Sequence, residues 1–244
     1  MISPSLHSEL APTGKLRVGI NYGNPVLATR DPASGELRGV AVDLARELGS
    51  RTGLPIELVG FESAGQMVEG LKAGAWDVAF LAVDPGRAGE IDFTAPYIEI
   101  EGTYLVPAGS PLRAIGDVDR DGVRIGVSAK SAYDLFLSRS VQRAELVRAP
   151  APNAAFELLV AGKVDVVAGV RQPLVTNAGK LPGSRVFDGR FMAIEQALGT
   201  PKGRDVAAKY LRKFIEDVKA SGLVARAIEK AGIRGVSVAP SGRA

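Results

Sequence analysis

Arg87 is the residue whose type and position most clearly suggest chemistry. The apolar run from Val78 to Val83 is too short for a helix and is bounded by turn residues, so it predicts a buried strand. Asp84 and Pro85 then suit the first turn of a short helix. Ligands of open α/β sheets bind at this carboxyl edge, where a guanidinium can hold a carboxylate through two parallel hydrogen bonds. The alternative role for Arg87 is a surface ion pair with Asp84 or Glu90.

The composition excludes several other kinds of site. The chain has 244 residues, 46% hydrophobic and 23% charged, which is typical of a globular protein of one or two domains. The net charge is only +3 and aromatic residues make up 6%, so we expect no nucleic-acid-binding face. Cysteine is absent and the single histidine is His7, which excludes thiol chemistry, a Ser-His-Asp triad in the core and a multi-histidine metal site. We therefore expect no metal and no cofactor.

The first hundred residues alternate between strand and helix patterns. Strands are predicted at Leu16 to Ile20 and Ile56 to Val59, and helices at Val40 to Arg51 and Ser63 to Ala73. This alternation predicts an α/β fold with a mostly parallel sheet flanked by helices.

The same order recurs in the second part of the chain. The strand-like segment from Val123 to Val127 echoes Leu16 to Ile20, and the segment from Leu158 to Val170 echoes Gly70 to Val83. Two lobes of similar topology are the expected result.

The predicted domain boundaries follow from this repeat. Strand-like crossovers at Glu99 to Pro111 and Phe191 to Gly203 join the two lobes and act as a hinge. The predicted parts are a disordered segment 1–14, a discontinuous lobe 1 of residues 15–105 plus 198–232, a lobe 2 of residues 106–197, and a loose tail 233–244.

Several segments, in this order, resemble periplasmic solute-binding proteins of family 3, the amino-acid type that serves ABC importers. They are LRVGI, GELRGVAVDLARELGSRTG, LKAGAWDVAF and DPGRAGEIDFTAPY, then GVRIGVSAKSAYDLFL, AFELLVAGKVDVVAG and KFIEDVKASGLVARAIEKAG. The resemblance covers roughly residues 15 to 232. It implies the two-lobed periplasmic-binding-protein type 2 fold, a small ligand held between lobes that close by hinge motion, a monomer without enzymatic activity, and an ABC transporter permease as partner.

The resemblance also implies which residues hold the ligand's carboxylate. Arg87 matches the arginine of the family's T-P-x-R motif, and Asp84 stands at the threonine position. In the turn SAKSAYD, Ser131 is expected to help bind the carboxylate with backbone N–H groups, and Ser128 is the second choice. The alternative is that Ser131 only caps the following helix.

The loop after the first strand completes the expected site in lobe 1. Family members often carry aromatic residues at the positions of Asn24 and Ala64, and neither is aromatic here. Tyr22 is expected to substitute in part, and Asn21 and Asn24 are further candidate ligand-binding residues in this loop.

The departures from the family pattern predict an anionic ligand. An acidic residue that binds the ligand's ammonium group usually follows the strand from Val164 to Gly169, but Val170 and Arg171 stand there. Arg87 and Arg171 together favour an anion, because an ammonium group would be buried without a partner. We expect a mono- or dicarboxylate, an acidic or modified amino acid, or a phosphonate-like compound. Arg171 as a solvated loop residue is the alternative.

Two other functions fit the same scaffold. One is a cyclohexadienyl dehydratase-like lyase acting on prephenate or arogenate, which needs a general acid in the pocket. The other is a ligand-binding sensor module from a larger receptor. The candidate acids are Glu62, Glu101, Glu195 and Asp84, each of which also suits a surface or capping role.

The location follows from the resemblance rather than from a targeting signal. The start, MISPSLHSELAPTGK, lacks the apolar core of a secretory signal, and no run approaches the roughly 18 to 20 apolar residues of a membrane span. We expect a periplasmic protein in a mature form without its leader, with a cytoplasmic protein as the alternative.

Overall fold

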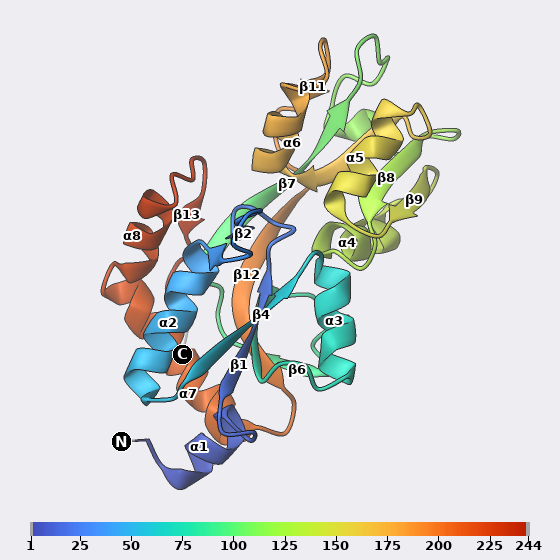
Figure 1. Cartoon of the computed structure of the whole chain (residues 1–244). Helices are drawn as coiled ribbons and strands as arrows, with labels where there is room; N and C mark the ends of the chain where they lie inside the picture. Colours follow the sequence, from blue (N-terminus) through green and yellow to red (C-terminus); the bar gives the residue numbers. More distant parts are fainter. Residues whose placement is uncertain (1, 243–244) are drawn as a thin grey trace. The chain divides into compact units, whose positions relative to one another are not determined.

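The computed structural model describes residues 2–242 and divides the chain into two compact units. Unit 1 comprises the residues up to Glu99 and those from Glu195 onward, and unit 2 comprises Ile100–Ile194. The chain passes between the units inside strand β7 (Ile98–Val106) and again inside strand β12 (Met192–Pro201) (Figure 1). The units divide a few residues before the boundaries predicted at 105/106 and 197/198. The sequence does not mark the exact position, because β7 and β12 each continue through the division as one unbroken strand.

Unit 1 is a mostly parallel sheet with helices on both faces. Its parallel strands lie in the order β4-β1-β5, β12 is antiparallel to β5, and β6 is antiparallel to β12. Figure 1 shows α3 on one side of this sheet and α2, α7 and α8 on the other. The strands are β1 (Leu16–Asn21), β4 (Ile56–Phe61), β5 (Val78–Ala82) and β6 (Ile91–Phe93), with a separate hairpin of β2 (Thr29–Arg30) and β3 (Leu37–Arg38). The helices are α2 (Val40–Thr52), α3 (Ala64–Lys72), α7 (Asp205–Ala220) and α8 (Leu223–Lys230).

Unit 2 repeats this topology. Its parallel strands lie in the order β9-β8-β10, β7 is antiparallel to β10, and β11 pairs with β7. The strands are β8 (Arg124–Ser128), β9 (Glu145–Ala149), β10 (Val166–Val170) and β11 (Arg185–Val186). The helices are α4 (Ala132–Ser140), α5 (Pro152–Val160), α6 (Arg171–Ala178) and the 3₁₀ turn η1 (Ile115–Asp117). The predicted α/β class with mostly parallel sheets is confirmed.

The sequence repeat corresponds to one ion pair that occurs once in each unit. At the start of β1, the Arg17 guanidinium donates to both carboxylate oxygens of Asp77 at 2.9 Å. At the start of β8, the Arg124 guanidinium donates to both oxygens of Asp165 at 3.1 and 3.0 Å. Each arginine also donates to the carbonyl of a glycine, Gly74 or Gly162, in the helix-to-strand turn just before its aspartate partner. The repeated residues therefore tie the first strand of each sheet to the third.

The first residues are ordered, although their composition suggests a disordered segment 1–14. Helix α1 (Pro4–Leu10) is capped by the Ser3 hydroxyl and buries Leu6 and Leu10. Glu9 accepts a hydrogen bond from the Ala207 N–H at the start of α7. The prediction was wrong because a capping serine and two leucines four positions apart suffice for one amphipathic helix when a partner helix is at hand. Residue 1 lies outside the described residues.

Most of the C-terminal tail is also attached to unit 1, contrary to the prediction of a loose segment 233–244. Strand β13 (Ser237–Val238) pairs with Glu99 and Ile98 of β7, and Ala239 is buried. The Lys219 ammonium donates to the Pro240 carbonyl at 2.9 Å. The sequence did not indicate β13, because a strand of two residues is too short to show an alternation of apolar and polar residues. Residues 243–244 lie outside the described residues.

None of the helices within residues 2–242 is both long and apolar enough to cross a membrane.

Candidate functional site

Arg87 lies in a tight connection at the carboxyl end of β5. Residues 85–90 form successive hydrogen-bonded turns rather than the predicted short helix, because only eight residues separate Ala82 from Ile91, where β6 begins. The Asp84 carbonyl accepts from the N–H groups of Arg87 and Ala88 at 3.0 and 3.1 Å. The Asp84 carboxylate accepts from the N–H of Gly86 at 2.7 Å, which closes the first turn.

The Arg87 side chain is buried, with 4% of its surface exposed. Its Nη1 donates to the carbonyl of Ala82, the last residue of β5, at 2.8 Å. Burial lowers the pKa of the guanidinium to about 10, while the Asp84 carboxylate acts in the opposite direction. The group remains charged at neutral pH, and its desolvation makes a ligand anion an energetically favourable neighbour.

The two asparagines of the loop after β1 shape the loop itself. The Asn21 side-chain oxygen accepts from the N–H of Gly23 at 3.0 Å, and that of Asn24 accepts from the N–H of Val26 at 3.2 Å. The Asn24 carbonyl also accepts from Leu27. Ligand binding by either asparagine stays a prediction.

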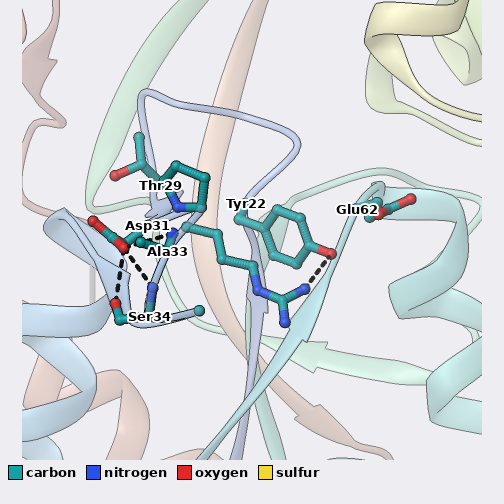
Figure 2. A pocket seen from close by; sticks show the side chains of 9 residues that line it. Tyr22, Thr29, Asp31, Ala33, Ser34 and Glu62 are labelled. Carbon is teal, nitrogen blue, oxygen red and sulfur yellow. Dashed lines mark hydrogen bonds between the residues drawn. The ribbon is translucent and has the colours of Figure 1, made fainter.

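Tyr22 lines an open hollow of about 730 Å³ in unit 1 (Figure 2). Its ring packs on the backbone of β4, where a Cβ added at Gly60 would lie 3.1 Å from the ring. The Arg30 guanidinium lies 5.4 Å from the ring centroid, and its Nη1 donates to the Tyr22 hydroxyl at 3.3 Å. The hollow is lined by Tyr22, Thr29, Arg30, Asp31, Pro32, Ala33, Ser34, Gly35 and Glu62.

Unit 2 presents a tight turn between β8 and α4. Ser131 is buried and caps α4, with its hydroxyl accepting from the N–H of Asp134 at 3.1 Å. Ser128 ends β8, and its carbonyl accepts from the N–H of Ser131 at 3.2 Å. Between them Lys130 adopts a left-handed conformation with φ 58°. The capping role of Ser131 is therefore present, and ligand binding by Ser131 or Ser128 stays a prediction.

Tyr133 supports this turn from within the first turn of α4. Burial raises the pKa of its hydroxyl to about 12, while the Ser131 and Ser128 hydroxyls act in the opposite direction. The Asp134 carboxylate holds the other side, accepting from the Lys130 N–H at 2.8 Å and from Arg148 Nε at 3.0 Å. The turn is thus held in place by side chains of its own unit.

Arg171 is engaged within unit 2 and is not the solvated loop residue of the alternative interpretation. Its Nε donates to Glu101 at 2.5 Å, its Nη1 donates to the Phe187 carbonyl at 3.0 Å, and its Nη2 donates to the Gly189 carbonyl. The register of β10 against β7 explains the pairing, because Val170 lies opposite Gly102. A role for Arg171 in anion binding stays a prediction, and its guanidinium already forms an ion pair with the Glu101 carboxylate.

The four acidic residues considered as the general acid of a dehydratase are either engaged in local contacts or exposed to solvent. Glu101 pairs with Arg171, and Asp84 closes its own turn. Glu62 and Glu195 are exposed. Within the part of the chain that the structure describes, no cluster of histidine and acidic residues could hold a metal ion.

Comparisons with known proteins give one consistent result. The sequence profile described as "Bacterial extracellular solute-binding proteins, family 3" matches residues 16–232. Among curated relatives, the virulence sensor protein BvgS of Bordetella pertussis is 26% identical over 186 residues, which is 74% of this chain and 15% of that protein. The chain thus spans about 15% of the length of the sensor proteins it matches.

Two solved structures illustrate the likeness in fold. A solute receptor for L-cysteine of Neisseria gonorrhoeae is 22% identical, with a TM-score of 0.83 over 98% of this chain and 100% of that one. The amino acid ABC transporter substrate-binding protein AbpA of Streptococcus pneumoniae, bound to L-arginine, is 21% identical, with a TM-score of 0.77 over 91% of this chain and 96% of that one.

Proposed function

Because the chain belongs to family 3 of the bacterial extracellular solute-binding proteins, we propose that it captures a small carboxylate-bearing ligand, amino-acid-like or an organic anion. The chain is a solute-binding protein of the amino-acid type with the two-lobed type 2 fold, and its family and its structural neighbours are mostly substrate-binding proteins rather than enzymes. The observation that carries the proposal is the buried Arg87 guanidinium, fixed at the carboxyl end of β5.

Arg87 is the proposed carboxylate-binding residue. Its side chain is held by the Ala82 carbonyl, so little side-chain entropy is lost when a ligand binds. Hydrogen bonds between a guanidinium and a carboxylate contribute about 1.5 to 3 kcal/mol each, and a bidentate pair makes two of them. Asp84 has a supporting role in this proposal, because it closes the turn that carries Arg87.

The turn at Ser131 is the proposed second binding element. The first amides of α4, at Ala132 and Tyr133, have no acceptor inside the helix, and such amides bind anions readily. Ser131 and Ser128 add hydroxyl groups at the same turn. A ligand that uses the binding residues of both units favours the closed state by its differential affinity for it.

The proposed partner is the permease of an ABC importer, and the proposed location is the periplasm. A sensor module is a second candidate, favoured by the similarity to part of BvgS. Uptake of a labelled ligand by cells separates the two. Deletion of the gene abolishes uptake if the protein serves an importer, whereas uptake persists and a transcriptional response disappears if it serves a sensor.

Calorimetric titration with a panel of amino acids and organic acids tests the proposed ligand class. We expect Arg87→Met to lower the affinity for carboxylates about 100-fold or more, from the loss of two charge-assisted hydrogen bonds. Arg38→Met is the matched control, because Arg38 is an exposed arginine of the same unit that pairs with Glu36. Binding that survives Arg87→Met, or binding of amines that lack a carboxylate, would refute the proposal.

A further inference from the structure

We propose that Arg30 binds a second anionic group of the ligand, so that the preferred ligand carries two negative charges. The inference rests on the proposed function and names the substrate class of that site. Arg30 ends strand β2 of the hairpin of β2 and β3 and lines the hollow beside Tyr22. No family motif or sequence spacing marks it.

The Arg30 guanidinium is positioned by Tyr22. It lies 5.4 Å from the ring centroid and donates to the hydroxyl at 3.3 Å. The ring in turn packs on Gly60, because a Cβ added there would lie 3.1 Å from the nearest ring atom. A stacked guanidinium keeps its remaining N–H donors in one plane, which suits a carboxylate or phosphonate.

The charges around the hollow leave Arg30 available for a ligand. Among the described residues, Arg30 forms no ion pair with a carboxylate. The Asp31 carboxylate is occupied by its own turn, accepting from the N–H groups of Ala33 at 3.0 Å and Ser34 at 2.7 Å. In the view of Figure 2, Asp31 and Glu62 lie on opposite sides of the Tyr22 ring. The hollow therefore presents one guanidinium, Arg30, and of the two acids that line it, Asp31 accepts hydrogen bonds within its own turn.

Arg87 and Tyr22 follow neighbouring strands of one sheet. The strand order β4-β1-β5 places the end of β1, next to Tyr22, between the ends of β4 and β5. The Arg30 guanidinium lies over the Tyr22 ring, so both cationic side chains belong to segments that follow neighbouring strands at the same edge of the sheet.

The test is titration of the full chain, freed of bound ligand by unfolding and refolding, with two pairs of probes. L-glutamate is compared with L-glutamine, and glutarate with butyrate, so that each pair differs in one anionic group. We expect the doubly anionic member to bind about tenfold more tightly, and the difference to shrink as salt is added. Arg30→Gln should remove the difference, Tyr22→Phe should reduce it, and Arg38→Gln should leave it intact.

The outcomes separate this inference from the proposed function. If L-glutamine or butyrate binds as tightly as its doubly anionic partner, or if Arg30→Gln leaves the difference unchanged, the inference is overturned. Absence of binding by L-glutamate and glutarate at about 10 mM, far weaker than ordinary ligand affinities, also overturns it. In each case, carboxylate binding that depends on Arg87 would leave the proposed function standing. Thermal unfolding of the Arg30→Gln protein, unchanged at an exposed position, confirms that the variant is folded.

Discussion

The ion pair between arginine and aspartate occurs once in each unit, which allows its contribution to stability to be compared in a buried and a more exposed setting. Asp77 and Asp165 occupy equivalent positions, and each accepts two hydrogen bonds from the guanidinium of an arginine in the first strand of its sheet. Their side chains differ in exposure, with 0% of the Asp77 side chain and 39% of the Asp165 side chain open to solvent. Asp77 also accepts from Arg204 at 3.0 Å.

We expect Asp77→Asn to destabilise unit 1 far more than Asp165→Asn destabilises unit 2. The first substitution leaves two partly buried guanidinium groups without their carboxylate, and breaking a buried pair costs about 3 to 5 kcal/mol. The second removes a pair that water already screens, for which about 0.2 to 1 kcal/mol is expected. Asparagine keeps the shape of aspartate and loses the charge and one acceptor oxygen at both sites, so the comparison isolates the effect of burial.

Amide hydrogen exchange followed by mass spectrometry is the appropriate assay, because a chain of two units need not unfold in a single transition. Peptides that contain β1 and β5 should lose protection in Asp77→Asn, and peptides that contain β8 and β10 should change little in Asp165→Asn. Equal losses in the two units would refute the reasoning that burial determines the cost. So would a loss in Asp77→Asn that is confined to peptides outside unit 1.

Three further predictions concern single residues of unit 2. Lys130→Gly should be more stable than Lys130→Ala by about 1 kcal/mol in urea unfolding, because alanine retains the strain of the left-handed conformation that glycine relieves; equal stability would contradict that strain. The Arg124 guanidinium lowers the pKa of Asp165, so the stabilisation by this pair is present above the ordinary pKa of about 3.9 and is lost as the pH falls through the lower folded value; in acid titrations the wild type should be more stable than Asp165→Asn above that range, and the two stabilities should converge as the pH falls through it. Burial raises the pKa of Tyr133 to about 12, so stability should fall as the pH rises above about 10, where the unfolded chain ionises first, and Tyr133→Phe should reduce this loss in alkaline unfolding.

Local patterns in the sequence were sufficient for the repeated elements of the fold. The short apolar run of β5 and the helical face of α2 both appear where periodicity and turn residues predict them. The similarity between the two halves has a physical basis, since Arg17 and Asp77 recur as Arg124 and Asp165 with the same contacts. Such features are predictable because each depends on residues close in sequence or on a motif that occurs twice.

Features that depend on register or on a distant partner could not be predicted in this way. Arg171 seemed available for a ligand because its partner, Glu101, is set by the pairing of β10 with β7, which the sequence does not reveal. Arg30 gave no signal, since its position over Tyr22 depends on how a hairpin folds back across the end of β1. Helix α1 was missed because its stability comes from contacts with residues almost two hundred positions away, such as that of Glu9 with Ala207.

The two units share a topology but differ in what they offer at the carboxyl ends of their strands. Unit 1 carries a buried guanidinium at Arg87, whereas the corresponding edge of unit 2 carries the hydroxyls and helix amides of the Ser131 turn, with the Arg171 charge offset by Glu101. A full charge contributes more to anion binding than a neutral donor does, because charge-assisted hydrogen bonds are about twice as strong. The proposed division of labour therefore predicts unequal effects: Ser131→Ala should weaken carboxylate binding by about tenfold or less, and Arg87→Met by about 100-fold or more. Equal losses in titration would mean that unit 2 supplies a charge of its own, and Arg171 would then have to leave Glu101 when the ligand binds.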